Sequence, residues 1–352
     1  MSLQSRLLTD TVQLAEHDHV LFLNSAADPF VASAAQQLHT GTITLAEDNI
    51  ASLHMAMHEL AQSSSLPVSL QHVAFHEYTS HEPAGTIDIA IMNILYQPGN
   101  TWIHYALRLA AYALKPGGRL YVLGAKDRGI LSVAKRMQET FGNVATLAIS
   151  KGQRVVCSRQ SENKPLGTTA SVATSINDPS ISLLPLVFAD GKLDEGTRLL
   201  IDALQVHPDD TALDIGCGAG FIGLHIAHLA AKGHVTMVDV SLATVAVAQR
   251  RVAASGLANI TVLPSDGAQA VLSQRFDLVV TNPPFHQGGI QTTAIAERFI
   301  GEAAQVLRPR GRFYLVANRF LKYEPTLRAH FKELHEVGGN TRYKVLQATS
   351  PH

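Results

Sequence analysis

The same order of strand-like and helix-like segments occurs twice in this chain, and this repetition constrains the fold more than any single motif. In the second half, short apolar runs alternate with longer segments whose apolar positions follow a helical period. The runs lie at residues 212–215, 235–239, 260–263, 276–280 and 312–317. Strands that alternate with helices predict a parallel sheet covered on both faces. A last apolar run at 342–348 would close the sheet.

The first half carries the same landmarks at a nearly constant offset. Apolar runs at 20–28 and 87–97 stand where the second half has a glycine-rich turn and a strand that ends in Asn. Residues 114–123 repeat the helix, turn and strand of 307–316, and 153–158 mirror the terminal strand. A length of 352 residues also suits two domains better than one. The sequence therefore predicts an α/β protein of two tandem Rossmann-like domains.

The boundary between the two halves is indicated by composition. A Ser-, Thr- and Pro-rich stretch without an apolar period begins near residue 161. Such composition is typical of a linker. We therefore expect a first domain at 1–160, a linker at 161–178 and a second domain at 179–352.

A glycine-rich turn follows the first strand of the second half. Gly216, Gly218 and Gly220 allow the chain to turn tightly and to pass close to a ligand. The N-terminus of the next helix offers free N–H groups beside them. Dinucleotide-binding proteins use G-x-G-x-x-G at this place, whereas this chain has G-x-G-x-G preceded by Asp214. An anionic side chain suits the amino group and sulfonium of S-adenosylmethionine (SAM) better than phosphates. We therefore predict a SAM site that includes Cys217 as a small side chain in the turn.

Two further acidic residues follow neighbouring strands. Asp239 ends the second strand and would accept hydrogen bonds from the ribose hydroxyls of the cofactor, with Val240 beside it. Asp266 follows the third strand and would face the adenine amino group, with Gly267 beside it. A turn or helix N-cap is an equally good interpretation of Asp266.

The segment Asn-Pro-Pro-Phe after the fourth strand indicates transfer to an amino group. An exocyclic amine of a nucleobase is a poor nucleophile because its lone pair is delocalised into the ring. Asn282 Oδ1 and the Pro283 carbonyl could both accept from the amine and orient its lone pair toward the methyl group. Pro283 and Pro284 would fix the backbone, and Phe285 would stack on the flipped base. A proline turn with a buried Phe285 is the structural alternative.

The first half repeats the scaffold without this chemistry. Ser25, Ala26 and Ala27 stand in place of the glycines, and Asn-Ile-Leu-Tyr at 93–96 lacks both prolines. The first domain is therefore predicted to be a degenerate copy that serves fold stability or RNA docking. The alternative is that it binds a cofactor of its own.

Composition limits the remaining function classes. The chain has two cysteines and scattered histidines, which predicts neither a disulfide framework nor a metal site. No apolar run is long enough to span a bilayer, and no signal peptide begins the chain, so a cytoplasmic protein is expected. A net charge of −1 argues against bulk electrostatic binding of nucleic acid but permits a local patch. Candidates for phosphate contacts are Arg298, Arg308, Arg310, Arg312, Arg319, Lys322 and Arg328.

With these motifs the chain resembles the bacterial ribosomal RNA guanine-N2 methyltransferases, specifically those of the small subunit. The resemblance covers both halves and includes the segments 187–197, 282–286, 288–293 and 316–321. Residues 190–193 depart from the family, which usually has a shorter segment with an arginine there. The resemblance implies a class I SAM-dependent methyltransferase that acts on the exocyclic N2 of a guanine in 16S rRNA. It also implies the small ribosomal subunit as partner and a monomer without a metal.

Three other functions remain open on the sequence. One is a large-subunit relative that methylates 23S rRNA, and another is an amino methyltransferase acting on adenine in DNA or on a protein glutamine. The third is a non-catalytic, SAM-binding ribosome assembly factor. An NAD-dependent dehydrogenase has the least support, because nothing beside the glycine turn supplies hydride chemistry.

Overall fold

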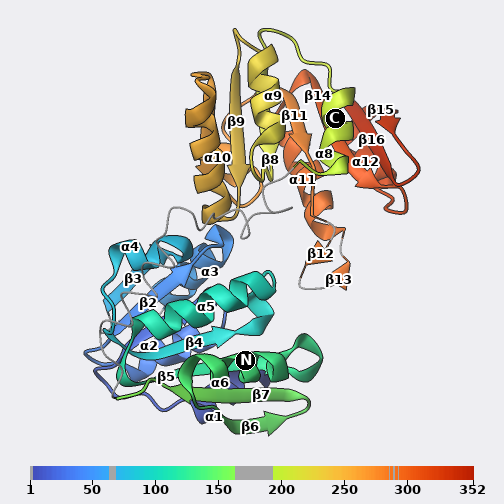
Figure 1. Ribbon diagram of the computed structural model, residues 1–352. Helices are drawn as coiled ribbons and strands as arrows, with labels where there is room; N and C mark the ends of the chain where they lie inside the picture. The colour runs from blue at the N-terminus through green and yellow to red at the C-terminus, as the bar shows by residue number, and fades with distance from the viewer. Residues whose placement is uncertain (1–2, 63–68, 163–192, 285, 288–289, 292) are drawn as a thin grey trace. The chain divides into compact units, whose positions relative to one another are not determined.

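The chain forms two compact units, Met1–Ser182 and Leu183–His352 (Figure 1). The computed structural model describes residues 3–62, 69–162, 193–284, 286–287, 290–291 and 293–352. Most of the predicted linker at 161–178 lies outside these residues, so the predicted domain boundaries stay a prediction. None of the helices in the described part is long and apolar enough to cross a membrane.

The first unit alternates strands and helices. Its strands are β1 His19–Leu23, β2 Thr42–Glu47, β3 Ser69–Ala74, β4 Ile87–Asn93, β5 Leu114–Ala125, β6 Ala145–Ser150 and β7 Gln153–Arg159. Its helices are α1 Leu3–Thr11, α2 Phe30–Gln37, α3 Ile50–Ala61, α4 Tyr78–His81, α5 Asn100–Ala113 and α6 Ile130–Phe141, with short 3₁₀ turns η1 Phe75–Glu77, η2 Ile94–Tyr96 and η3 Lys126–Arg128.

The second unit repeats this order. Its strands are β8 Thr211–Ile215, β9 His234–Asp239, β10 Ile260–Pro264, β11 Phe276–Thr281, β14 Leu307–Asn318, β15 Phe331–Gly339 and β16 Tyr343–Pro351, and a short hairpin pairs β12 His286–Gln287 with β13 Ile290–Gln291. Its helices are α8 Glu195–Ala203, α9 Phe221–Leu229, α10 Leu242–Ser255, α11 Ala294–Val306 and α12 Glu324–His330, with a 3₁₀ turn η6 Gln269–Val271.

The two main sheets have the same topology. Their strand orders are β3-β2-β1-β4-β5-β7-β6 and β10-β9-β8-β11-β14-β16-β15. The strands from β3 to β5, and from β10 to β14, are parallel, whereas the last two strands of each sheet are antiparallel. The predicted duplication and the two Rossmann-like domains are confirmed. The predicted parallel strands are present, but the last two strands of each sheet run antiparallel, so each sheet is mixed.

Alternating residues of the central strands divide the core of the second unit into two layers. Leu278 and Val280 of β11 belong to the cluster that includes side chains of α8, α9 and α10. Val279 belongs to the opposite cluster, which includes side chains of α11 and α12. This alternation is the period of an extended strand, and both faces are covered because β11 is buried on both sides. The arrangement brings the carboxyl ends of the parallel strands to one edge of the sheet.

Candidate active site

The predicted glycine turn and the predicted transfer residue meet at this carboxyl edge. Ile215 ends β8 and is the register partner of Thr281, which ends β11. The Thr281 hydroxyl also donates to the Ile215 carbonyl at 2.8 Å, and both residues are fully buried. Gly216 and Asn282 therefore leave the sheet side by side, although they are far apart in the sequence.

The backbone of the turn requires its glycines. Gly216, Gly218 and Gly220 have φ angles of +71°, +55° and +84°, in the left-handed region that side chains disfavour. A Cβ placed on Gly218 would meet no atom within 4 Å, so this glycine leaves open space beside the turn. The Gly216 and Cys217 amides both donate to the Val238 carbonyl, at 2.9 and 3.0 Å, which holds the turn against β9. A cofactor can approach a backbone closely only where the turn is tight and no side chain fills the space beside it, and both conditions are met here.

Asp214 lies fully buried directly below this turn. One carboxylate oxygen accepts the Gly223 amide of α9 at 3.0 Å, while Oδ1 is buried without a hydrogen-bond partner in the described part of the chain. Burial is the main cause that raises the pKa of Asp214 to about 7. A buried acceptor without a donor is costly, so its presence indicates a ligand or a water that donates to it. This orphaned oxygen and the open space at Gly218 fit the predicted SAM site.

Asp239 is oriented by two backbone amides. Its Oδ2 accepts from Gly218 at 3.0 Å and its Oδ1 accepts from Ser241 at 3.0 Å, which ties the end of β9 to the glycine turn. Burial raises the pKa of Asp239, and these donors act in the opposite direction. Burial, reinforced by the charges of Asp239 and Asp214, raises the pKa of the Cys217 thiol well above its ordinary value. Cys217 is therefore a neutral buried side chain in the turn, as predicted for its packing.

Asp266 takes part in a polar cluster that the sequence did not indicate. Its Oδ1 accepts from Arg298 Nη2 at 2.5 Å, and Arg298 also lies 3.6 Å from the buried Glu302. Glu302 accepts the Ala268 amide at 2.8 Å. Gly267 has a φ of +61°, and a Cβ there would collide with the Glu302 carboxylate. Gly267 is thus required by packing, and Arg298 contacts Asp266 through Oδ1.

Asn282 is held by residues from the start of α8. Its Nδ2 donates to Thr197 Oγ1 at 2.9 Å and lies 3.5 and 3.4 Å from the two carboxylate oxygens of Asp194. Asp194 is also the N-cap of α8 and accepts the Thr197 amide at 3.2 Å. Neither Asp194 nor Thr197 was singled out from the sequence. The Asp-x-x-Thr spacing of a helix start was the signal that could have found them.

The residues after Asn282 are described only in part. Pro283 is buried and Pro284 is exposed, whereas Phe285 lies outside the described residues, so its predicted stacking role stays a prediction. A pocket opens at Asn282 and the end of β14. It is lined by Asn282, Pro283, Val316, Ala317, Asn318, Leu321, Tyr323 and Tyr343.

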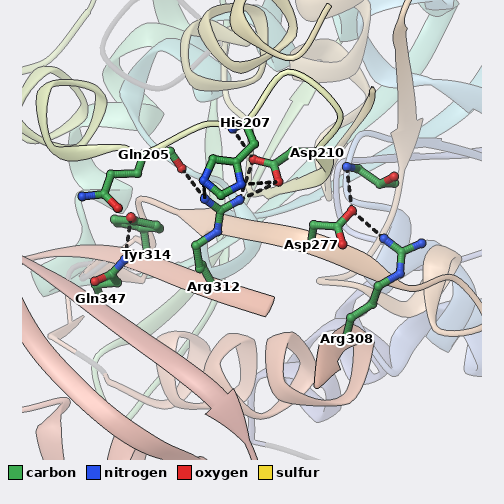
Figure 2. A network of polar contacts seen from close by, with 9 residues as sticks. Gln205, His207, Asp210, Asp277, Arg308, Arg312, Tyr314 and Gln347 are labelled. Carbon is green, nitrogen blue, oxygen red and sulfur yellow. Dashed lines mark hydrogen bonds and ion pairs between the residues drawn. The ribbon is translucent and has the colours of Figure 1, made fainter. Parts of the chain in front are cut away.

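Several arginines proposed for phosphate contacts have other partners. Arg312 forms an ion pair with the buried Asp210, and Arg308 forms one with Asp277 (Figure 2). Asp210 precedes β8 and Asp277 lies at the start of β11, so these pairs stand at the amino end of the sheet, opposite the glycine turn. The structure therefore gives the buried Arg312 a structural role, whereas a phosphate contact by the exposed Arg308 stays a prediction. Arg319, at the end of β14, pairs with Glu336.

The equivalent edge of the first unit is filled by its own side chains. Gln97 Nε2 donates to the carbonyls of Leu23, Asn24 and Asn93 at 3.0–3.2 Å. Glu47 ends β2 as Asp239 ends β9, and it accepts the Ala26 amide at 2.9 Å. These buried bonds occupy the place where a cofactor would pass, which supports a degenerate first copy.

Comparison with known proteins gives a consistent result. Residues 179–347 match the family described as methyltransferase small domain, and residues 5–152 match the methyltransferase small domain N-terminal family. The chain is 30% identical over 351 residues to ribosomal RNA small subunit methyltransferase C of Shewanella loihica, covering 98% of each chain. It is 32% identical to the protein of that name from Hahella chejuensis over 248 residues, 69% of this chain and 72% of the relative.

A solved structure is similar along the whole chain. It is the T. thermophilus 16S rRNA N2 G1207 methyltransferase in complex with AdoMet and guanosine. The sequences are 28% identical, the match covers 99% of this chain and 92% of the other, and the TM-score is 0.79.

Proposed function

Because this chain belongs to the ribosomal RNA small subunit methyltransferase C family, we propose that it transfers a methyl group from SAM to the exocyclic N2 of a guanine in 16S rRNA. The observation that carries the proposal is the juxtaposition of the glycine turn with Asn282 across the paired ends of β8 and β11. A complex of the T. thermophilus relative with AdoMet and guanosine supports it.

The second unit would hold SAM along the carboxyl edge of its sheet. SAM supplies an electrophilic methyl group on a positively charged sulfur. Gly216, Gly218 and Gly220 would let the backbone approach it, with Cys217 packed in the turn. The carboxylate of Asp239 would accept from the ribose, with Val240 beside it. Asp214 Oδ1 offers a buried acceptor.

The adenine end of the cofactor is assigned to the next strand. Asp266 and Gly267 follow β10, and Arg298 leaves one Asp266 carboxylate oxygen without this ion pair. We propose that this oxygen accepts from the adenine amino group. The ion pair would then orient the carboxylate rather than replace its ligand.

Asn282 would act on the guanine amine. Asn282 Oδ1 and the Pro283 carbonyl would accept its two N–H groups, orient its lone pair and stabilise the positive charge that develops as nitrogen attacks carbon. Pro284 would restrict the backbone there, and Phe285 would stack on the base at about 1 to 3 kcal/mol. As the bond from nitrogen to the methyl carbon forms, the carbon–sulfur bond of SAM would break and its electron pair would stay on sulfur, which leaves as S-adenosylhomocysteine. The proton lost from nitrogen would then pass to water.

The first unit would support the fold or dock RNA, and would not bind SAM. Division into residues 1–160, 161–178 and 179–352 is part of this proposal. We further propose that the enzyme acts as a monomer without a metal and works in the cytoplasm, where its substrate, the small ribosomal subunit, is found. Light scattering and metal analysis of the active protein test the monomeric and metal-free parts.

The test is tritium transfer from labelled SAM to small ribosomal subunits or 16S rRNA that lack the modification. Wild type should label N2-methylguanosine in digested 16S rRNA, and Asn282→Ala should lose at least about a hundredfold in rate, as for removal of a donor or acceptor at a developing charge. Label in 23S rRNA instead would assign the chain to a large-subunit reaction. SAM binding without transfer to any RNA would favour the assembly factor.

A further inference from the structure

Asn282 lies at one end of a hydrogen-bond chain that terminates on a carboxylate. Its Nδ2 donates to Thr197 Oγ1 at 2.9 Å, and the Thr197 hydroxyl donates to Asp194 Oδ2 at 2.5 Å. Both Asp194 oxygens also lie near the outer limit of hydrogen bonding from Nδ2, at 3.5 and 3.4 Å. The three side chains come from the end of β11 and the first turn of α8.

These hydrogen bonds permit only one orientation of the Asn282 amide. The Asp194 carboxylate oxygens accept hydrogen bonds, and the Thr197 hydroxyl uses its single proton on Asp194. Both groups therefore present lone pairs to Asn282. An amide turned the other way would place Oδ1 against these lone pairs, which repel it. Asp194 and Thr197 thus direct Nδ2 toward α8 and leave Oδ1 on the opposite side.

The first unit shows what happens to the same side chain without this arrangement. Asn93 is the counterpart of Asn282 in the first unit. Ile89 of β4 and Leu278 of β11 pair with equivalent positions of the neighbouring strand, and each asparagine follows four residues later. Asn93 Nδ2 donates to Asp28 Oδ2 at 2.7 Å, and Asn93 Oδ1 accepts the Leu95 amide at 3.0 Å. Both ends of this amide are therefore taken by the protein itself.

The prolines after Asn282 prevent this local capping. Pro284 stands two residues after Asn282, the position that Leu95 has after Asn93, and proline has no N–H to donate. Pro283 likewise has none. A turn in which the asparagine oxygen accepts an amide two residues ahead is common, and here its donor is absent.

We infer that Thr197 and Asp194 are positioning residues that hold Asn282 as a hydrogen-bond acceptor, and that Pro284 keeps the local backbone from occupying this acceptor. The inference rests on the proposed function, in which Asn282 Oδ1 receives the target amine. It assigns a distinct task to the second proline of the motif, and it adds two residues that precede the glycine turn.

The first experiment replaces Thr197 by valine, which has nearly the same shape but no hydroxyl. Single-turnover transfer to unmodified 16S rRNA should slow about tenfold to a hundredfold, because a misoriented acceptor loses that order of rate. The dissociation constant for SAM and the unfolding midpoint should stay near wild type. Thr197→Ser retains the hydroxyl and should recover most of the rate. Thr349→Val removes a hydroxyl that bonds Glu333 on the edge strands and serves as the matched control.

Two further variants test the other contacts. Asp194→Asn keeps a good N-cap for α8 but brings an N–H₂ group to the chain, so the Asn282 amide is no longer fixed and the rate should fall. Pro284→Ala restores a backbone N–H two residues after Asn282 and should slow transfer without weakening SAM binding. Pro284→Ala keeps the inference testable if Thr197→Val does not fold.

The outcomes separate this inference from the proposed function. No transfer by wild type and Thr349→Val overturns the proposed function and this inference with it. Transfer by both, with Thr197→Val, Asp194→Asn and Pro284→Ala equal to wild type, overturns only the inference. Equal losses in Thr197→Ser and Thr197→Val also overturn it, because the hydroxyl would not be the cause.

Discussion

Removal of Arg312 is expected to destabilise the second unit strongly. The Arg312 side chain is 12% exposed and that of Asp210 is 4% exposed. Arg312 Nη2 lies 2.5 Å from both Asp210 oxygens, and Nη1 donates to the Gln205 carbonyl at 2.9 Å (Figure 2). Without the guanidinium, the Asp210 carboxylate keeps the His207 amide at 2.7 Å but loses its charged partner in a nearly dry site. Breaking a buried pair in this way costs about 3 to 5 kcal/mol.

The assay compares Arg312→Met with Arg310→Met by urea and thermal unfolding. Methionine retains much of the aliphatic stem, so the comparison isolates the charge and its hydrogen bonds. Arg310 is exposed on the same strand and has no ion pair within the described residues. For a unit of this size, 3 to 5 kcal/mol corresponds to a fall of about 6 to 20 °C in the unfolding midpoint of Arg312→Met. Adding Asp210→Asn should recover part of the loss, because the unpaired charge disappears.

A different outcome would refute this assignment. If Arg312→Met and Arg310→Met unfold alike, while Arg312→Met alone weakens RNA binding and reduces its salt dependence, Arg312 contacts phosphate. The ion pair would then contribute little to stability, and the buried geometry would have been misread as structural.

Three further predictions concern the cofactor, pH and RNA. Asp239→Asn should weaken SAM binding about tenfold to a hundredfold in calorimetry, since hydrogen bonds to a charged group are worth about 1.5 to 3 kcal/mol. Glu47→Gln, at the equivalent place in the first unit, should leave the affinity for SAM unchanged. Equal losses of affinity in the two variants would mean that the first unit binds SAM. Burial raises the pKa of Glu47 from 4.5 to about 7, so the folded state binds the proton more tightly and the first unit should lose up to about 3 kcal/mol as pH rises from 4.5 through 7. Urea titrations at pH 5 and 8 should show a smaller loss for Glu47→Gln than for wild type, because Asp214 still titrates in the second unit, and equal losses would contradict the prediction. Phe320 is 60% exposed and precedes Leu321, which lines the pocket at Asn282. Phe320→Ala should therefore raise the KM for 16S rRNA about fivefold to a hundredfold by loss of base stacking, whereas Phe320→Tyr should not. An unchanged KM in Phe320→Ala would exclude this contact.

The buried strands were predictable from the sequence because burial on both faces leaves a continuous apolar run. β11 and its counterpart β4 are of this kind. The edge strands β6 and β15 were not predicted, since most of their side chains are exposed and their sequences show no apolar period. The mixed character of each sheet follows from these same strands. An apolar period in the sequence arises from buried side chains, and an exposed edge strand has few of them.

The site was predictable where its residues are neighbours in the sequence and not where they meet by folding. The glycine turn and Asn282 each follow a recognisable strand. Thr197 and Asp194 contact Asn282 from 85 and 88 positions away, and nothing in their own sequence shows that α8 begins beside β11. The ion pairs of Arg308 and Arg312 were not predicted for a related reason, because a list of basic residues does not say at which end of a strand they lie.

The first unit shows that loss of a cofactor site involves more than loss of glycines. Asn24 adopts a φ of +45°, in the left-handed region like its counterpart Gly216, whereas Ala26 and Asp28 do not share the positive φ of Gly218 and Gly220. Gln97 has taken the space beyond it and joins the ends of β1 and β4 through three backbone carbonyls. These buried bonds stabilise the closed edge, and the Ser25 hydroxyl adds to them by accepting the Asn93 amide at 3.0 Å. The same fold is thus stable without a cofactor site, because these hydrogen bonds hold the carboxyl edge of the first sheet closed.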